Sequence, residues 1–185
     1  MMRDQDSWEL KALPKILKQL PPRIRQDLSK RLEPIPLPDQ GTSQFIWGPS
    51  GTGKTILAAQ FYLEACRLRF LNGTNERIAF ISTPELFNQL KRSYSDPDRD
   101  EQHILEHYST VDILILDDFG AERPTEWVLT NLYLIVNRRY ENLLTTIFTS
   151  NFDLEGLAKH FGDDRVSSRI NRMIGDPLEL KTQRA

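Results

Sequence analysis

The chain has 185 residues, which is enough for one well-buried core and too few for a second full domain beside it. A formal net charge of -2 excludes general attraction to nucleic acid, so any DNA contact must come from a local basic patch. The single cysteine, Cys66, excludes an intramolecular disulfide, and the absence of a bilayer-length apolar run leads us to expect a cytoplasmic protein with no membrane partner.

Residues 1–40 are expected to form a short extension ahead of a domain over residues 41–185. Prolines divide this extension into pieces too short for a core of their own: Pro14, Pro21, Pro22, Pro34, Pro36 and Pro38. Apolar spacing predicts one short helix after Pro14 and a second after Pro22, the second carrying Ile24, Leu28 and Leu32. Basic side chains, among them Lys30 and Arg31, decorate both helices. The extension is either an arm packed on its own domain or a docking arm for a protein or DNA.

From residue 44 onward, strand-like and helix-like segments alternate. Short apolar strands are predicted over 44–48, 77–82, 111–118, 145–151 and 177–181. Helices are predicted between them, with Gly73 ending the helix after the first strand and Thr83 capping the helix after the second. Parallel strands need such crossover helices, so the pattern predicts a doubly wound α/β fold.

The sequence "GPSGTGKT" joins the first predicted strand to the helix that follows it. It comprises Gly48, Pro49, Ser50, Gly51, Thr52, Gly53, Lys54 and Thr55 and fits the phosphate-binding pattern GxxxxGK[ST]. Glycines let backbone N–H groups face the phosphates of ATP, and Lys54 reaches the β- and γ-phosphates. Thr55 is expected to hold Mg²⁺.

Two further strands end in polar residues, and the carboxyl ends of parallel strands meet at the edge of a sheet where ligands bind. Asp117, after "ILIL", is predicted to hold Mg²⁺ together with Thr55, and Asp118 to orient the attacking water. Ser150 and Asn151 end the next core strand near the expected γ-phosphate, and we interpret Asn151 as a phosphate sensor.

Phosphoryl transfer also uses positive charge, often from an arginine of another subunit. Arg165 and Arg169 lie four residues apart in "DDRVSSRINRM" and share one helix face, although the residues alone favour a surface helix paired with Asp163 and Asp164. Further basic residues could contact the phosphates of single-stranded DNA: Lys91, Arg92, Arg138 and Arg139. Trp47 lies near the expected adenine or in the core.

The order of "GPSGTGKT", "VDILILDDFGAE", "TEW", "NRRYEN", "TIFTSNFD" and "DDRVSSRINRM" resembles the AAA+ ATPases of the DnaC/DnaI helicase-loader and IstB transposition-ATPase group, over residues 41–181. The resemblance implies a P-loop NTPase fold, with a five-stranded parallel sheet in the order 5-1-4-3-2. It also implies ATP hydrolysis to ADP and phosphate, and self-assembly into a ring or spiral around DNA. Asn151 corresponds to the sensor, and Arg169, with Arg165 close behind, to the arginine acting on a neighbour's ATP.

Two departures from the group's pattern bear on function. Asp118 stands where many AAA+ proteins have glutamate, which implies slow hydrolysis. Few residues follow the fifth predicted strand in this sequence, so we expect no helical lid. We expect a helicase loader acting on a DnaB-like replicative helicase. The alternatives are a transposition ATPase that delivers transposase to target DNA and a nucleotide-switched binding module with little turnover. A small-molecule kinase is disfavoured, because no segment places arginines over an acceptor.

Overall fold

The computed structural model describes residues 5–28, 34–93 and 100–182. Five parallel strands form one sheet in the order β2-β3-β4-β1-β5, which confirms the predicted topology. Their bounds are Gln44–Trp47 for β1, Ile78–Ser82 for β2, Ile113–Phe119 for β3, Thr145–Ser150 for β4 and Leu178–Glu179 for β5. Parallel register brings the carboxyl ends of β1, β3 and β4 to one edge, where Trp47 pairs with Ser150 and Phe119 with Ser150.

Alternating side chains of the strands fill two apolar cores, one on each face of the sheet. On β1, Phe45 belongs to one core and Ile46 to the other. On β3, Leu114 and Leu116 join Phe45, while Ile115 joins Ile46. Such period-two alternation, with both faces apolar, is what a parallel sheet covered by helices on both sides requires.

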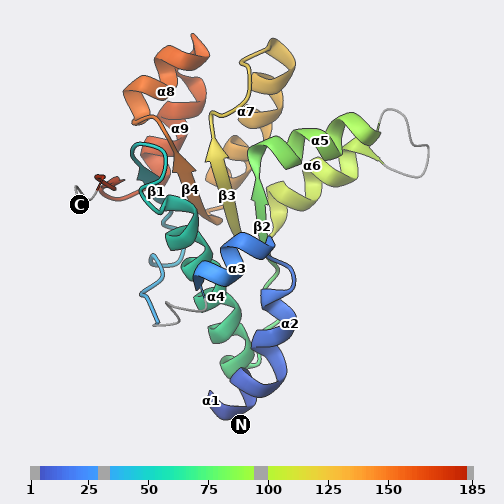
Figure 1. Cartoon of the computed structure of the whole chain (residues 1–185). Helices are drawn as coiled ribbons and strands as arrows, with labels where there is room; N and C mark the ends of the chain where they lie inside the picture. Colours follow the sequence, from blue (N-terminus) through green and yellow to red (C-terminus); the bar gives the residue numbers. More distant parts are fainter. Residues whose placement is uncertain (1–4, 29–33, 94–99, 183–185) are drawn as a thin grey trace.

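Helices form the outer two layers (Figure 1). α4 (Lys54–Asn72) covers one face and ends at Gly73, which takes the left-handed conformation with φ 67°. The opposite face is covered by α5 (Thr83–Ser93), α6 (Glu101–Thr110), α7 (Glu126–Glu141), α8 (Leu154–Phe161) and α9 (Arg165–Met173). None of the helices in the described ranges combines the length and the apolarity that crossing a membrane requires.

The start of α5 differs from the prediction that Thr83 caps it. The backbone N–H of Glu85 donates to Ser82 Oγ at 3.4 Å, so Ser82 takes the capping position. The Thr83 hydroxyl instead donates to the carbonyl of Asp117 at 2.9 Å and links α5 to β3.

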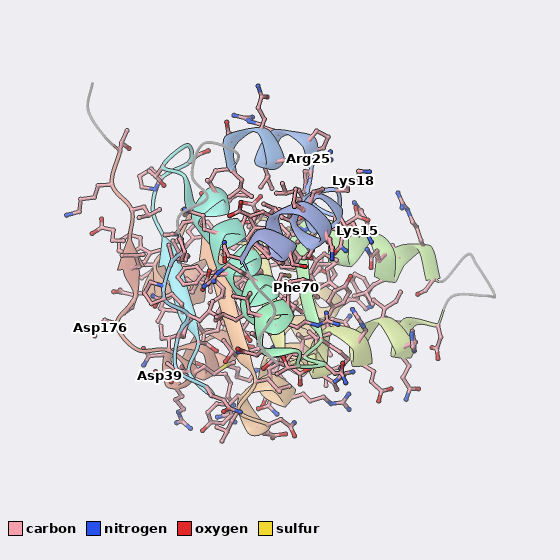
Figure 2. The ribbon with its side chains drawn as sticks, turned by 90° about the horizontal axis from the view of Figure 1, so that it is seen from below. Lys15, Lys18, Arg25, Asp39, Phe70 and Asp176 are labelled. Atoms are coloured by element: carbon pink, nitrogen blue, oxygen red, sulfur yellow. The ribbon has the colours of Figure 1, made fainter. Side chains whose placement is uncertain are left out.

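The arm that precedes β1 packs on its own domain. It comprises α1 (Gln5–Ser7), a π-helical turn η1 (Trp8–Ala12), α2 (Leu13–Leu17) and α3 (Pro22–Leu28), so helix begins earlier than the sequence predicts. Trp8, Leu20 and Leu28 are buried in the core formed with α4. Figure 2 shows Lys15 and Lys18 on the arm and Arg25 on α3. The predicted contributions of Lys30, Arg31 and Leu32 lie outside the described residues.

Candidate nucleotide-binding site

The backbone of the loop between β1 and α4 depends on glycine. A Cβ on Gly48, whose φ is 146°, would lie 2.1 Å from the carbonyl oxygen of Leu180, so a side chain there collides with the β5 segment. Gly51 and Gly53 also have positive φ, 83° and 93°, and a Cβ on either would meet no atom within 4 Å. Gly48 therefore holds the loop against the sheet, while the other two let the backbone turn and keep the space in front of it open.

Lys54 lies at the centre of the loop with only 6% of its surface exposed. Its Nζ donates to the carbonyls of Gly48 at 2.8 Å and Pro49 at 2.9 Å, and to Oδ1 of Asn151 at 2.9 Å. Burial lowers the pKa of the ammonium, and the charges of Asp118 and Asp117 oppose that shift. The predicted phosphate-binding cation and the predicted sensor, 97 residues apart in the sequence, are thus in direct contact.

Thr55 and Asp117, the predicted Mg²⁺ ligands, also meet, since Thr55 Oγ1 donates to Asp117 Oδ1 at 3.1 Å. Asp117 is 3% exposed, and burial raises its pKa while bonds from Thr149 and Thr55 act in the opposite direction. The hydroxyl of Thr149 on β4 donates to the same oxygen at 2.6 Å. Sequence reasoning missed Thr149, although its place on the strand beside Asp117 could have indicated it.

Asp118 is held beside Asp117 by an irregularity in β3. The pairing of β3 with β4 shifts register between Leu116 and Phe119, and Asp118 has a positive φ of 54°. Its backbone N–H donates to Thr149 Oγ1 at 2.9 Å. Consecutive residues of a regular strand point to opposite faces, so the bulge is what lets both acids line one hollow.

These groups converge on a hollow of about 590 Å³ at the carboxyl edge of the sheet, called the phosphate hollow below. The predicted residues that line it are Ser50, Gly51, Gly53, Lys54, Thr55, Asp117, Asp118 and Asn151. Thr52 donates to the Pro49 carbonyl at 3.0 Å and lines a neighbouring hollow. A hydroxyl and a carboxylate oxygen in contact are the hard oxygen donors that Mg²⁺ prefers, so Thr55 and Asp117 fit this ion.

Arg165 and Arg169 lie on α9 and do not line the phosphate hollow. Arg165 pairs with Asp163 at 2.6 Å, and its guanidinium lies 5.6 Å from the ring centre of Tyr133. Nε of Arg169 donates to Asn137 Oδ1 at 2.9 Å, and its guanidinium lies 5.1 Å from the ring centre of Tyr140. One stripe of α7 therefore holds both arginines outside the hollow of their own protomer.

Two sequence interpretations, those of Ser150 and Arg139, change with the structure, and the alternative left open for Trp47 is decided in favour of the core. The Ser150 hydroxyl donates to the carbonyl of Phe119 at 2.7 Å and is fully buried, so it joins two strand ends and does not face a phosphate. Trp47 packs on the core and lines neither hollow at the loop.

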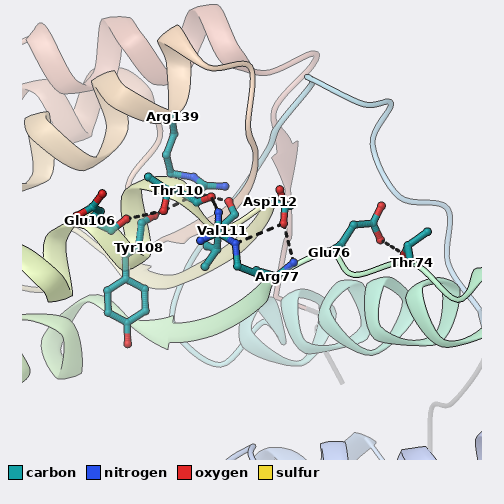
Figure 3. Close-up of polar contacts among 9 residues, drawn as sticks. All are labelled: Thr74, Glu76, Arg77, Glu106, Tyr108, Thr110, Val111, Asp112 and Arg139. Atoms are coloured by element: carbon teal, nitrogen blue, oxygen red, sulfur yellow. Dashed lines mark hydrogen bonds and ion pairs between the residues drawn. The ribbon is translucent and has the colours of Figure 1, made fainter.

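Arg139, expected on the surface as a DNA contact, has no exposed area. Its guanidinium donates to the carbonyls of Val111, Thr145 and Tyr108 and to the hydroxyl of Thr146, at 2.7 to 3.1 Å. Figure 3 shows the bonds to Tyr108 and Val111. Burial lowers the pKa of Arg139 to about 9. The side chain is therefore a structural cation that joins α7 to the starts of β3 and β4.

Comparison with known proteins shows that the sequence of this chain is similar to those of replicative helicase loaders. The chain is 31% identical over 123 residues to the replicative helicase loader DnaI of Bacillus subtilis, covering 66% of this chain and 37% of the relative. It is 27% identical over 152 residues to the replicative helicase loader DnaC of Escherichia coli, covering 82% and 58%. The chain thus spans between about a third and three fifths of these two relatives.

Among solved structures, a crystal structure of DnaI matches with a TM-score of 0.62 and 26% identity, over 90% of this chain and 93% of that one. AMPPCP-bound DnaA from Aquifex aeolicus matches with a TM-score of 0.64 and 22% identity, over 90% and 50%, which bears on the fold alone. The model of the family described as IstB-like ATP binding protein matches residues 22–178, which include α3, the loop, both acids and Arg169. The chain belongs to this family of ATP-binding proteins and has the AAA+ fold.

Proposed function

We propose that this chain binds ATP with Mg²⁺ in the phosphate hollow and hydrolyses it to ADP and phosphate. The observation that carries the proposal is the convergence of Lys54, Thr55, Asp117 and Asn151 through hydrogen bonds at the edge where β1, β3 and β4 end. Ligands of open parallel sheets bind at this edge. Backbone amides of the loop and Lys54 bind the phosphates, and membership of an ATP-binding family supports the choice of nucleotide.

In this proposal each acid has a separate task. Thr55 and Asp117 hold Mg²⁺, which when bound neutralises charge on the phosphate oxygens. Asp118 orients the attacking water, because its carboxylate lines the same hollow without being buried as Asp117 is. Asn151 contacts the γ-phosphate and, through Lys54, links the end of β4 to the loop.

The hydrolytic site is completed by Arg169 of a neighbouring subunit, with Arg165 as the second candidate. Support comes from the placement of both guanidinium groups outside the hollow of their own protomer. An arginine supplied in trans stabilises charge that develops during phosphoryl transfer. The proposal therefore requires assembly of the chain, as a ring or spiral, when ATP is bound.

The work driven by this cycle is loading of a DnaB-like replicative helicase onto single-stranded DNA in the cytoplasm. The helicase-loader relatives support this choice. Lys91, Arg92 and Arg138 are exposed, as a contact with DNA phosphates requires, whereas Arg139 is buried. A second candidate, delivery of transposase to target DNA, is favoured by the match to the IstB-like family model.

The test measures ATP affinity by calorimetry and phosphate release in the presence and absence of single-stranded DNA. Lys54→Ala is expected to lose binding, because the loop loses its only lysine and the cation at its centre. Arg169→Ala is expected to bind ATP as wild type but to lose most hydrolysis, on the order of 10³-fold. Arg172→Ala, an exposed arginine on the same helix, is the matched control.

Equal loss of binding and hydrolysis in Arg169→Ala would contradict a role in trans. Wild-type protein that assembles with ATP but releases no phosphate would indicate the nucleotide-switched binding module instead. Association of the ATP-bound protein with a purified hexameric helicase, and not with a transposase, is expected. The reverse preference would select the transposition role.

A further inference from the structure

The short helix α3 of the arm lies across α4 (Figure 1). Its residues Arg23, Ile24 and Asp27 line the phosphate hollow. Leu28 at its end is fully buried in the core shared with α4, and Ile24 both packs against this core and borders the phosphate hollow. Nη2 of Arg25 donates to the carbonyl of Leu20 at 3.3 Å. The helix is therefore anchored to the ATPase core on one side, which fixes the direction of its other side.

That other side lines the phosphate hollow. Pro21, Arg23, Ile24 and Asp27 face the same space as Lys54, Asp117, Asp118 and Asn151. Arg23 is exposed and carries the only positive charge among the four arm residues that line this hollow. A guanidinium that lines a hollow built for phosphates has the charge and the donor geometry to bind a phosphate oxygen.

A second hollow of about 680 Å³ adjoins the first. Four residues line both hollows, so the two are continuous across the loop: Asp27, Gly51, Gly53 and Ile56. The second hollow adds the apolar side chains of Leu57 and Leu180. A nucleotide whose phosphates occupy the first hollow can place its base against these apolar groups. Its ribose then lies at the junction, next to Asp27, whose carboxylate can accept hydrogen bonds from ribose hydroxyls.

We propose that α3 is the cover of the nucleotide site, with Arg23 binding the terminal phosphates and Asp27 the ribose. The proposal rests on the proposed function, because it takes ATP as the occupant of the phosphate hollow. In the described part of the chain no helical lid follows β5, whereas α3 reaches the site from the other end of the domain. Nucleotide binding and seating of the arm are then coupled, and the coupling is reciprocal.

The test uses calorimetry with unlabelled nucleotides, because a label on the ribose would occupy the position in question. Arg23→Ala is expected to weaken the binding of a non-hydrolysable ATP analogue with Mg²⁺ about tenfold. The binding of ADP is expected to weaken less than about threefold, because ADP lacks the terminal phosphate. Lys18→Ala removes one positive charge from the same arm at a residue that lines neither hollow. It is the matched control and is expected to leave both affinities unchanged.

Asp27→Ala tests the ribose contact by the ratio of affinities for ADP and 2′-deoxy-ADP, since this ratio cancels any general effect of the lost charge on phosphate binding. Wild type is expected to favour ADP about tenfold. The variant is expected to bind the two nucleotides almost equally, because it lacks the carboxylate that accepts from the ribose hydroxyl. Hydrogen exchange of residues 21–28 gives a readout on unmodified protein. These amides are expected to become more protected when the ATP analogue binds.

The proposal that α3 covers the site is ruled out if Arg23→Ala and Lys18→Ala have the same affinities for both nucleotides. It is also ruled out if hydrogen exchange of residues 21–28 is unchanged when the ATP analogue binds. An unchanged ribose preference in Asp27→Ala removes the ribose assignment. Circular dichroism and Arg23→Lys, which keeps the charge, separate loss of folding from loss of the contact. Failure of wild type to bind either nucleotide would count against the proposed function, whereas normal binding that depends on Lys54 but not on Arg23 overturns the cover alone.

Discussion

Replacement of Thr149 by valine removes the hydroxyl that holds both acids of β3 and keeps the shape of the side chain. The hydroxyl donates to Oδ1 of Asp117 at 2.6 Å and accepts from the backbone N–H of Asp118 at 2.9 Å. A hydrogen bond to a buried carboxylate contributes about 1.5–3 kcal/mol, and an orphaned N–H adds about 1 kcal/mol more. We expect the free energy of unfolding of Thr149→Val to fall by about 2–4 kcal/mol in urea denaturation.

The same variant is expected to hydrolyse ATP about 10- to 100-fold more slowly at saturating ATP and Mg²⁺, because groups that orient a metal ligand have effects of this size. Loss of the bond to its ionised form raises the pKa of Asp117 further, so the acid side of the pH–rate profile shifts to higher pH. ATP affinity changes little, because the loop and Lys54 are intact.

Two controls make this result specific. Thr149→Ser keeps the hydroxyl and is expected to restore most activity, while Thr145→Val makes the same exchange at the far end of β4. Thr149→Val could instead release phosphate as fast as Thr145→Val, with no shift in the acid side of its pH–rate profile. In that case the claim that the Thr149 hydroxyl positions the two acids is wrong.

Three further predictions concern stability. Gly48→Ala puts a Cβ 2.1 Å from the Leu180 carbonyl, so a loss of about 3 kcal/mol or more is expected in urea unfolding; wild-type stability would refute the close approach. Arg139→Met leaves three carbonyls without their donor, which predicts a loss of about 3–5 kcal/mol and a melting temperature lower by roughly 10 °C; an unchanged melting temperature would show that solvent satisfies them. Glu122 has both carboxylate oxygens buried without a hydrogen-bond partner among the described residues. Its pKa is raised from 4.5 to about 7, mainly by burial and in part by the charge of Asp118, while the charge of Lys91 opposes the shift. The folded state thus holds a proton that the unfolded chain releases, and stability falls as pH rises from about 4.5 to 7. Glu122→Gln is therefore expected to be more stable than wild type by about 1–2 kcal/mol at pH 8, after allowance for solvent screening, and close to wild type near pH 4.5; a pH-independent difference would contradict this.

The strand order was implied only by the family resemblance, whereas the meeting of Lys54, Thr55, Asp117 and Asn151 could be predicted from the residues, because parallel strands bring their carboxyl ends to a common edge. The loop pattern fixes where one strand ends, and polar residues after apolar runs mark two others. Local pattern was enough here, since each signal lies within a few residues of a strand end.

Other features depend on tertiary contacts that leave no local mark. Thr149 looks like any β-branched strand residue, and only its neighbour across the sheet gives it a role. Arg139 resembles a basic residue in the last turn of a surface helix, yet carbonyls from α6, β4 and the start of β3 surround it. The position of α3 over the phosphate hollow follows from how Leu28 docks on α4, which apolar spacing alone does not predict.

A mixing experiment tests most directly the claim that neighbouring subunits share one ATP site. Asp118→Asn keeps Arg169 but lacks the acid that orients water, and Arg169→Ala keeps the acids but lacks the arginine. Each variant alone is expected to be nearly inactive, and an equal mixture to recover on the order of a quarter of wild-type phosphate release, because random assembly pairs an intact hollow with an intact neighbour at that frequency. A mixture no more active than the two variants measured separately would contradict the account.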